Sequence, residues 1–440
     1  MTKAVSATEN LSEPESGARV RLGHVRWTIC AMLFAATSIN YVDRQVLAIL
    51  EPTLQHAIGL TQVDYGYILA GFQVAYAIGV IGAGWLIDRL GTRLGYCLFM
   101  AIWALSAIGH SLASNALEFG MARFSLGLGE SGNFPAAIKS VAEWFPQKER
   151  SLATGIFNSG AAVGAVLAPA VVPWVALHYS WRAAFLITGA FSMLWIFWWF
   201  RNYRRPADYP KLSAGERSYI EASQMDAGPE TGVRIPWPRL LGYRQTWAFT
   251  IGKFLTDPIW WFFLFWLPPY FSSRFHLTLA HLGLPLVIVY AASTVGSIGG
   301  GWFPVPFRKL GMSPSRARFA AMFICACCVV PIFTAGRLHS ESMAIALIGL
   351  AAAAHQGWSA NLFTTSSDMF PKGAVASVVG IGTCAGSAGS ALLNIGTGWI
   401  VHITHSYASL FALASSAYLV ALFIIVLLAP GLKKVEGIAL

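Results

Sequence analysis

Charged residues are scarce in this sequence. Asp, Glu, Lys and Arg together make up 11% of its 440 residues, whereas hydrophobic residues make up 56%. Soluble globular domains carry roughly 25% charged residues, and a mean hydropathy of +0.57 is far too apolar for such a domain. The composition excludes an ordinary soluble protein and predicts a polytopic protein whose main partner is the lipid bilayer.

Patterns typical of enzymes and ATP-driven pumps are missing as well. The six cysteines lie in apolar stretches without metal-ligand or disulfide spacing, so we interpret them as small buried thiols. The phosphate-loop pattern of Gly, four residues and Gly-Lys-Ser/Thr does not occur. No His, Asp and Cys cluster has catalytic spacing. We therefore expect neither an enzyme nor a bound metal or organic cofactor.

The net charge of +10 would suggest nucleic acid in a soluble protein. Here the basic residues occur in alternate loops, with only Arg182, Arg274 and Arg337 on the opposite side, so the positive-inside rule is the better interpretation. This rule predicts a multi-pass protein of the cell inner membrane with both termini in the cytoplasm. Residues 1–22 lack the basic-then-apolar pattern of a signal peptide and are interpreted as a short disordered tail.

Apolar windows of about 20 residues, with few or no charged residues, mark the expected membrane spans. The first begins at Trp27 and continues past Asp43 and Arg44. The others are 65–87, 94–117, 122–146, 151–177, 182–200, 247–271, 282–307, 319–336, 342–369 and a long window, 373–432, which the polar cluster 402–407 divides into two. The fold class predicted is an all-α membrane protein of twelve transmembrane helices. We expect a tail (1–22), a six-helix bundle (23–200), a cytoplasmic central loop (201–244), a second bundle (245–430) and a tail (431–440).

The two halves repeat at an offset of 225 residues. Phe145-Pro146, Gly155 and Gly164 recur as Phe370-Pro371, Gly380 and Gly389, and Glu130 corresponds to His355. Parallel six-helix repeats are typical of transporters that bind substrate near the membrane midplane, between the halves.

Two charged residues lie in the apolar first part of the fourth span. Arg123 and Glu130 are seven residues apart, which places them on nearly the same helix face. A charge near the bilayer centre costs at least a few kcal/mol, so a cation and an anion on one face are a candidate functional site.

The turn after the second span carries a recognisable motif, Gly84-Trp85-Leu86-Ile87-Asp88-Arg89-Leu90-Gly91-Thr92-Arg93. Here the chain resembles the major facilitator superfamily, whose signature loop has Gly84, Asp88, Arg89, Gly91 and Arg93 at this spacing. An acid near a helix end can meet arginines or a helix N-terminus and hold one side of the protein closed. The second copy, from Gly301-Trp302 to Gly311, lacks the acidic residue.

Further motifs narrow the resemblance. They are Asn40-Tyr41-Val42-Asp43-Arg44, the stretch 123–135 with Glu130, and Glu143-Trp144-Phe145-Pro146 followed by Glu149-Arg150-Ser151. They look like the anion:cation symporter family, whose members carry organic anions such as hexuronates, aldonates and glucarate, usually with protons. The resemblance implies functional roles for Asp43, Arg44, Arg123 and Glu130.

The chemistry of these four residues fits that implication. A carboxylate substrate needs a fixed cation, and a guanidinium can bind it in a bidentate manner, so Arg44 is the candidate, with Arg123 next. A proton-coupled carrier needs a buried carboxyl near arginine, which Asp43 and Glu130 offer. A static salt-bridge network between the first and fourth helices remains the alternative.

A sugar acid also needs hydroxyl partners and aromatic walls. The family pattern suggests Tyr41 and Tyr76, although single tyrosines are often ordinary packing. Further candidates are Asn158, Trp260, Trp261, His355, Gln356, Trp358, Asn361, Thr365 and Asn394. His355 is equally well explained as a hydrogen-bonded core histidine. Lys253 and Asp257, four residues apart, are interpreted as an ion pair outside the site.

The sequence thus predicts a monomeric, proton-coupled symporter that imports a sugar-acid anion such as glucuronate or galacturonate by alternating access. Protons are the expected coupling ion. The alternatives are a carrier of another organic anion, such as galactonate or glucarate, and an uncoupled facilitator or exporter of the same fold.

Overall fold

The computed structural model describes residues 23–210, 212–225 and 237–435, and this part of the chain contains helices and no strand. The predicted tail 1–22 and the second half of the predicted tail 431–440, residues 436–440, lie outside the described residues. The first half comprises α1 (Val25–Ile58), α2 (Gln62–Leu90), α3 (Thr92–His110), α4 (Ala116–Glu130), α5 (Asn133–Trp144), α6 (Gln147–His178) and α7 (Trp181–Asn202).

The second half follows a connecting segment that holds η1 (Pro206–Asp208), α8 (Ala214–Met225) and α9 (Trp237–Leu240). Its elements are α10 (Arg244–Phe275), α11 (Leu279–Gly300), α12 (Pro304–Lys309), α13 (Pro314–Val329), η2 (Val330–Arg337), α14 (Glu341–Met369), α15 (Lys372–Thr404), α16 (Ala408–Leu428) and η3 (Pro430–Leu432). Taking α4 with α5 and α13 with η2 as single crossings, the helices follow the order of the twelve predicted spans.

Nine helices of the described chain are long and apolar enough to cross a membrane by length and composition. The three remaining crossings are α1, the broken α4–α5 pair and α10. All three contain buried charges: Asp43 and Arg44 lie in α1, Arg123 and Glu130 in α4, and Lys253 in α10. Because charges are costly in a bilayer, these three crossings are the ones to search for function.

Two predicted span boundaries were wrong. The third span was expected to reach residue 117, but α3 ends at His110, and the Asn115 side chain accepts a hydrogen bond from the Glu118 N–H to cap α4. The expected single span 122–146 is divided at residues 131–132. A window without charge does not detect an uncharged cap or a break. Small polar residues in the same role begin α2 (Thr61), α7 (Ser180) and α14 (Ser340).

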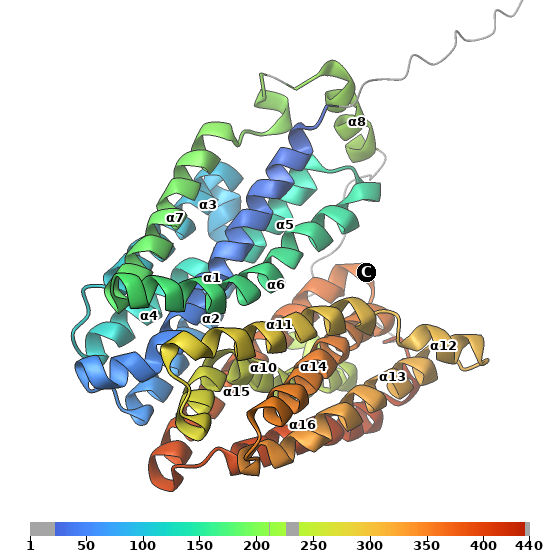
Figure 1. The fold of residues 1–440 in the computed structure, drawn as a ribbon. Helices are drawn as coiled ribbons and strands as arrows, with labels where there is room; N and C mark the ends of the chain where they lie inside the picture. Colours follow the sequence, from blue (N-terminus) through green and yellow to red (C-terminus); the bar gives the residue numbers. More distant parts are fainter. Residues whose placement is uncertain (1–22, 211, 226–236, 436–440) are drawn as a thin grey trace, which may run out of the picture.

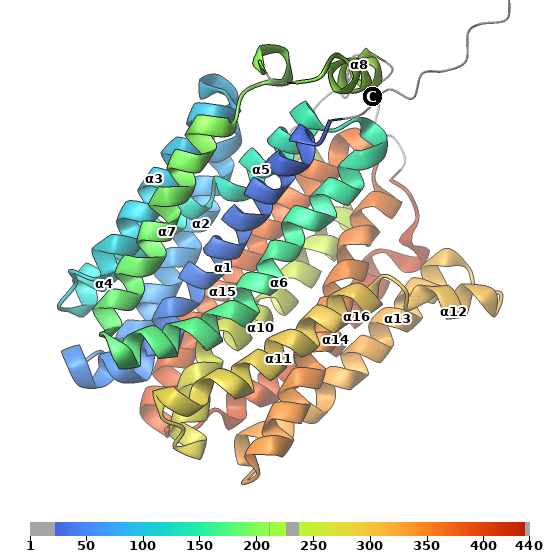
Figure 2. The same ribbon diagram turned by 45° about the horizontal axis from the view of Figure 1, so that its top comes forward.

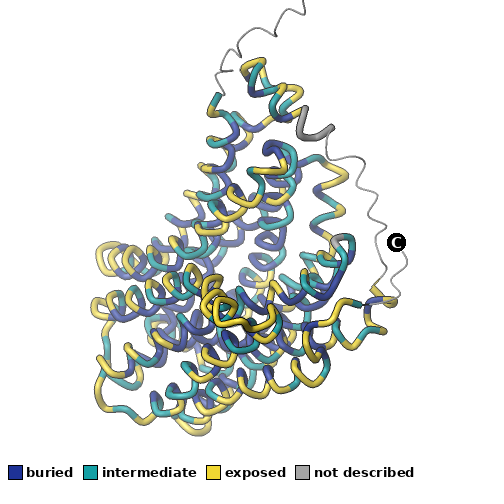
Figure 3. The backbone as a smooth tube through the Cα atoms, turned by 90° about the vertical axis from the view of Figure 1, so that its right-hand side faces the viewer, coloured by how far each residue is buried: buried dark blue, intermediate teal, exposed yellow. Residues whose placement is uncertain are grey.

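The two halves form separate bundles that touch most closely at the end of the molecule opposite α8 (Figures 1 and 2). We call this the sealed end, and the end with α8 the loop end. Near the sealed end the Tyr65 hydroxyl donates to the Phe265 carbonyl of the other half at 2.7 Å. Toward the loop end the two bundles diverge in Figure 1. Buried residues lie along the inner helix faces, and exposed residues follow the outer ones (Figure 3).

Glycines permit the close approach of the halves at the sealed end. A Cβ on Gly398 of α15 would stand 2.6 Å from the Gln62 carbonyl oxygen of α2, a distance that no real side chain tolerates. Gly396, two residues earlier on the same helix, has nothing within 4 Å of the equivalent position. The pair therefore offers a matched test of the seal.

We expect Gly398→Leu to keep the sealed end from closing, and Gly396→Leu to leave it intact. The measurement is the distance between spin labels at Leu117→Cys and His402→Cys, exposed positions in the two halves. Cys327 was expected to be buried but is exposed in the structure, so it is replaced by Ser. Gly398→Leu should lengthen this distance and slow transport. An unchanged distance distribution would show that the close contact does not hold this end shut.

Candidate functional site

The guanidinium of Arg44, on α1, lies between the two halves. Its Nε donates to Oε2 of Glu130 at 2.5 Å, and both side chains are almost completely buried. Four aromatic rings surround it, with centroids 5.0 to 5.6 Å from its central carbon: Tyr41, Phe72, Tyr76 and, from the second half, Trp261. One cation thus faces a carboxylate, a cage of rings and the opposite bundle.

Arg123 has a different partner from the one its spacing suggests. Its guanidinium donates to the backbone carbonyls of Arg44 at 2.7 Å and of Asp43 at 3.4 Å, and it stacks on the Phe72 ring. Glu130 is bound by Arg44 instead. The common face predicted for Arg123 and Glu130 did not reveal this arrangement, because spacing within one helix does not show which residue of α1 inserts beside it.

Asp43 is held by neutral donors. Its Oδ2 accepts from the Trp103 indole N–H at 2.6 Å and from the Ser192 hydroxyl at 3.3 Å. These donors come from α3 and α7, so Asp43 points into the first bundle while its neighbour Arg44 points toward the second. Asp43 and Glu130 are therefore two buried carboxyls with different surroundings.

Several buried polar atoms around Arg44 have no hydrogen-bond partner. They are Arg44 Nη2, Glu130 Oε1, Arg123 Nε and the side-chain amides of Asn40 and Gln73. An unsatisfied buried polar group costs about 1–3 kcal/mol. Their concentration on α1, α2 and α4 indicates a region built to receive a polar ligand or water.

The candidate residues of the second half are mostly satisfied within that half. His355 Nδ1 lies 2.6 Å from the Tyr418 hydroxyl, as expected for a hydrogen-bonded core histidine, and its ring stacks on Trp260. The bonds of four others are Trp358 to Thr256, Asn361 to the Gly300 and Gly357 carbonyls, Thr365 to the Leu362 carbonyl, and Trp266 to Asn394. Gln356 is half-buried, and Asn158 is exposed.

The predicted ion pair of Lys253 and Asp257 is present, with Nζ 2.6 Å from Oδ2. At the loop end Asp88 pairs with Lys139 of α5 at 2.7 Å, and Arg93 donates to the Phe200 carbonyl of α7. Gly91 adopts a φ of +78°, which favours glycine, and Arg89 stacks on Trp85. Gly84 has open space around it. The motif thus connects α2 and α3 to α5 and α7.

Phe72, Trp103, Ser192, Asn40 and Gln73 were missed in the sequence. Phe72 lies one turn before Tyr76, so the face shared with that candidate could have identified it. Trp103 and Ser192 meet Asp43 only through the packing of α3 and α7 on α1, and no local pattern signals this.

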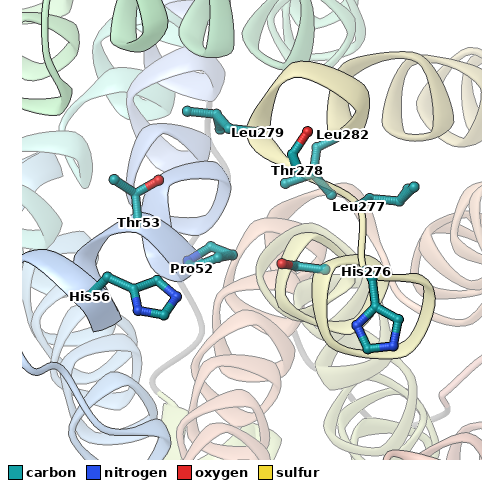
Figure 4. A pocket seen from close by; sticks show the side chains of 9 residues that line it. Pro52, Thr53, His56, His276, Leu277, Thr278, Leu279 and Leu282 are labelled. Atoms are coloured by element: carbon teal, nitrogen blue, oxygen red, sulfur yellow. The ribbon is translucent and has the colours of Figure 1, made fainter.

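Two cavities lie away from this centre, at the sealed end. One, of about 450 Å³, is lined by Pro52, Thr53 and His56 of α1 and by residues 272–282 of the second half (Figure 4). The other, of about 500 Å³, shares His56 and is also lined by residues 55, 59–62, 273, 401, 402, 405 and 407. Neither includes Arg44. Within the described residues no group of three His, Cys, Asp or Glu could hold a metal ion.

Comparison with known proteins assigns the chain to a family. The sequence model of the Major Facilitator Superfamily matches residues 33–393. The chain belongs to the major facilitator superfamily. Membership makes it a multi-pass membrane transporter rather than an enzyme, and the expected fold of twelve helices in two halves is confirmed.

Several curated proteins similar to this superfamily member are sugar-acid transporters by name. It is 31% identical to the hexuronate transporter of Escherichia coli K12 over 81% of this chain and 83% of that one. It is 36% identical to the galacturonate transporter of Dickeya chrysanthemi over 65% of this chain and 83% of that one. The predicted resemblance to sugar-acid transporters is therefore confirmed.

The fold also matches solved structures. The xylose transporter XylE from E. coli, in a partially occluded inward-open conformation, has a TM-score of 0.73 at 14% identity, covering 95% of this chain and all of that one. A bacterial homologue of the human lysosomal transporter Spinster has a TM-score of 0.69 at 16% identity, covering 93% and 96%. At such identities the likeness concerns the fold alone.

Proposed function

We propose that this transporter is a proton-coupled symporter that imports a hexuronate such as glucuronate or galacturonate. The observation that carries the proposal is the Arg44–Glu130 ion pair, buried between aromatic rings where the two halves face each other. The names of the relatives, hexuronate and galacturonate transporters, support the substrate class.

Proton and substrate transport are coupled because the carboxylate of Glu130 and that of the substrate compete for the same cation, Arg44. While Glu130 is ionised, it occupies Arg44, and a substrate carboxylate has to compete with it. A proton on Glu130 removes that competition and leaves the guanidinium free to bind the substrate carboxylate in a bidentate manner. Tyr41, Tyr76 and Trp261 then contribute apolar walls for the sugar ring and exclude water.

The neighbouring charges have supporting roles. Arg123 binds the carbonyls of Asp43 and Arg44, which fixes the part of α1 that carries both side chains. Asp43 is a second carboxyl able to take up a proton, and its bonds to Trp103 and Ser192 connect that event to α3 and α7.

The driving force depends on stoichiometry. The membrane potential supplies about 2.3 kcal/mol per net charge per 100 mV. One proton moving with one monoanion is neutral, so that stoichiometry draws on the pH gradient alone. In this proposal the protein is a monomer in the inner membrane. Both termini and the loop end face the cytoplasm, and the sealed end faces outward.

Other organic anions are the second candidate. The chain is also 29% identical, over 93% of its length, to a probable galactarate/D-glucarate transporter of Bacillus subtilis. It is 28% identical, over 88%, to a probable L-galactonate transporter of E. coli. An uncoupled facilitator or exporter is disfavoured, because it has no need of a carboxyl that competes for the substrate cation.

Glu130→Gln should abolish proton-driven accumulation of glucuronate and leave exchange of substrate across vesicles measurable. The amide keeps the shape of the side chain but neither titrates nor competes as a charge. The measurement is radiolabelled uptake with and without an uncoupler, compared with exchange in preloaded vesicles. Accumulation that stays sensitive to the uncoupler in this variant would exclude Glu130 as the coupling group.

Arg44→Lys should weaken uptake of the acid by roughly ten-fold or more in apparent affinity, because a point charge loses the bidentate geometry. The comparison is the concentration dependence of glucuronate uptake in wild type and variant, with protein amounts matched by immunoblot. An unchanged apparent affinity would move the carboxylate site elsewhere, with Arg123 as the next candidate.

A further inference from the structure

A stripe of side chains on α10 leads away from the Arg44 site. Lys253, Asp257 and Trp261 are spaced four residues apart and so lie on one face of the helix. The centroid of the Trp261 ring lies 5.1 Å from the central guanidinium carbon of Arg44. Asp257 is one turn, about 6 Å along the axis, closer to the loop end. The stripe therefore places an ion pair beside the substrate region.

The two members of this pair are not equally accessible. The Lys253 side chain is 6% exposed, and its ammonium lies 4.2 Å from the Phe363 ring centroid. The Asp257 side chain is 18% exposed, three times as much. The carboxylate is thus the more accessible member of the pair, and the ammonium is covered by Phe363.

Two glycines of α15 make room for this arrangement. A Cβ on Gly386 would stand 2.6 Å from Asp257 Oδ2, and one on Gly382 would stand 3.2 Å from Lys253 Cγ. Any larger residue at Gly386 would displace the carboxylate. The pair is therefore a packed feature with a defined orientation.

We propose that Asp257 determines specificity by selecting sugar acids with a single carboxylate. This inference rests on the proposed function. With the substrate carboxylate on Arg44, the far end of the molecule reaches toward Asp257. A carboxylate there accepts hydrogen bonds from hydroxyl groups, whereas the second carboxylate of an aldarate meets a like charge. Lys253 does not offset the repulsion, because Asp257 already occupies it.

The substrates for the test differ only at the far end. Galactonate and galactarate are open-chain acids, and a terminal hydroxymethyl group in the first replaces a carboxylate in the second. Galacturonate serves as the hexuronate reference. The readout is uptake of each labelled acid into proteoliposomes, with competition by the other unlabelled acids.

Wild type should prefer galactonate and galacturonate over galactarate by roughly ten-fold or more, the size of one hydrogen bond to a charged group. Asp257→Asn should reduce or reverse this preference, because it removes the like charge and leaves Lys253 free for a second carboxylate. The double variant Lys253→Met/Asp257→Asn should lose the gain in galactarate uptake. Asp368→Asn, which removes the partner of Arg318 elsewhere in the same half, should leave the preference unchanged.

The outcomes separate the proposed function from the proposed role of Asp257. If wild type carries none of these acids, the proposed function is wrong. If wild type carries galactarate as well as galactonate, the proposed function stands and the role of Asp257 is overturned. An Asp257→Asn variant that carries sugar acids with unchanged preference overturns it as well. If this variant does not fold, the wild-type preference still decides, since its absence contradicts the proposal.

Discussion

The ion pair between Arg44 and Glu130 is the interaction on which the rest of the site depends. Removing two charges from water costs several kcal/mol per ion, and mutual attraction offsets this only in a well-defined geometry. Here the geometry comes from α4. Glycines let this helix approach its neighbours so closely that a Cβ on Gly127 would stand 2.6 Å from the Phe72 carbonyl oxygen, and one on Gly129 would stand 2.4 Å from the Trp103 nitrogen. Glu130 then meets Arg44 at the last turn before the helix breaks.

Because the pair lies where the halves face each other, forming or breaking it alters contacts in both bundles. Trp261 brings the second half against the same guanidinium, while Asp43, the neighbour of Arg44, is hydrogen-bonded inside the first half. A substrate that replaces Glu130 on Arg44 thus changes contacts on each side of the interface. In our proposal Asp257 meets the far end of the substrate, where the second half presents a hydrogen-bond acceptor rather than a cation.

Much of this organisation could be predicted from sequence. Apolar windows and the repeat indicated twelve helices in two halves, and Asp43, Arg44 and Glu130 stood out because charges are rare in membrane spans. The partner of Glu130 could not be predicted, since it depends on how α1 packs on α4. The break after Glu130 and the cap at Asn115 carry no charge signal. In the second half, polar residues such as Asn361 proved to bond to backbone carbonyls, which sequence spacing does not distinguish from ligand contacts.

The central claim is that a substrate carboxylate displaces Glu130 from Arg44, and that the displaced carboxyl takes up a proton. The most direct measurement is calorimetric titration of galacturonate into the purified transporter, in buffers of different ionisation enthalpy at one pH. If the claim holds, the observed heat changes with the buffer in the direction of proton uptake, approaching about one proton per bound substrate, and affinity falls as pH rises. Binding whose heat is independent of the buffer, and whose affinity is constant between about pH 5 and 8, would contradict it.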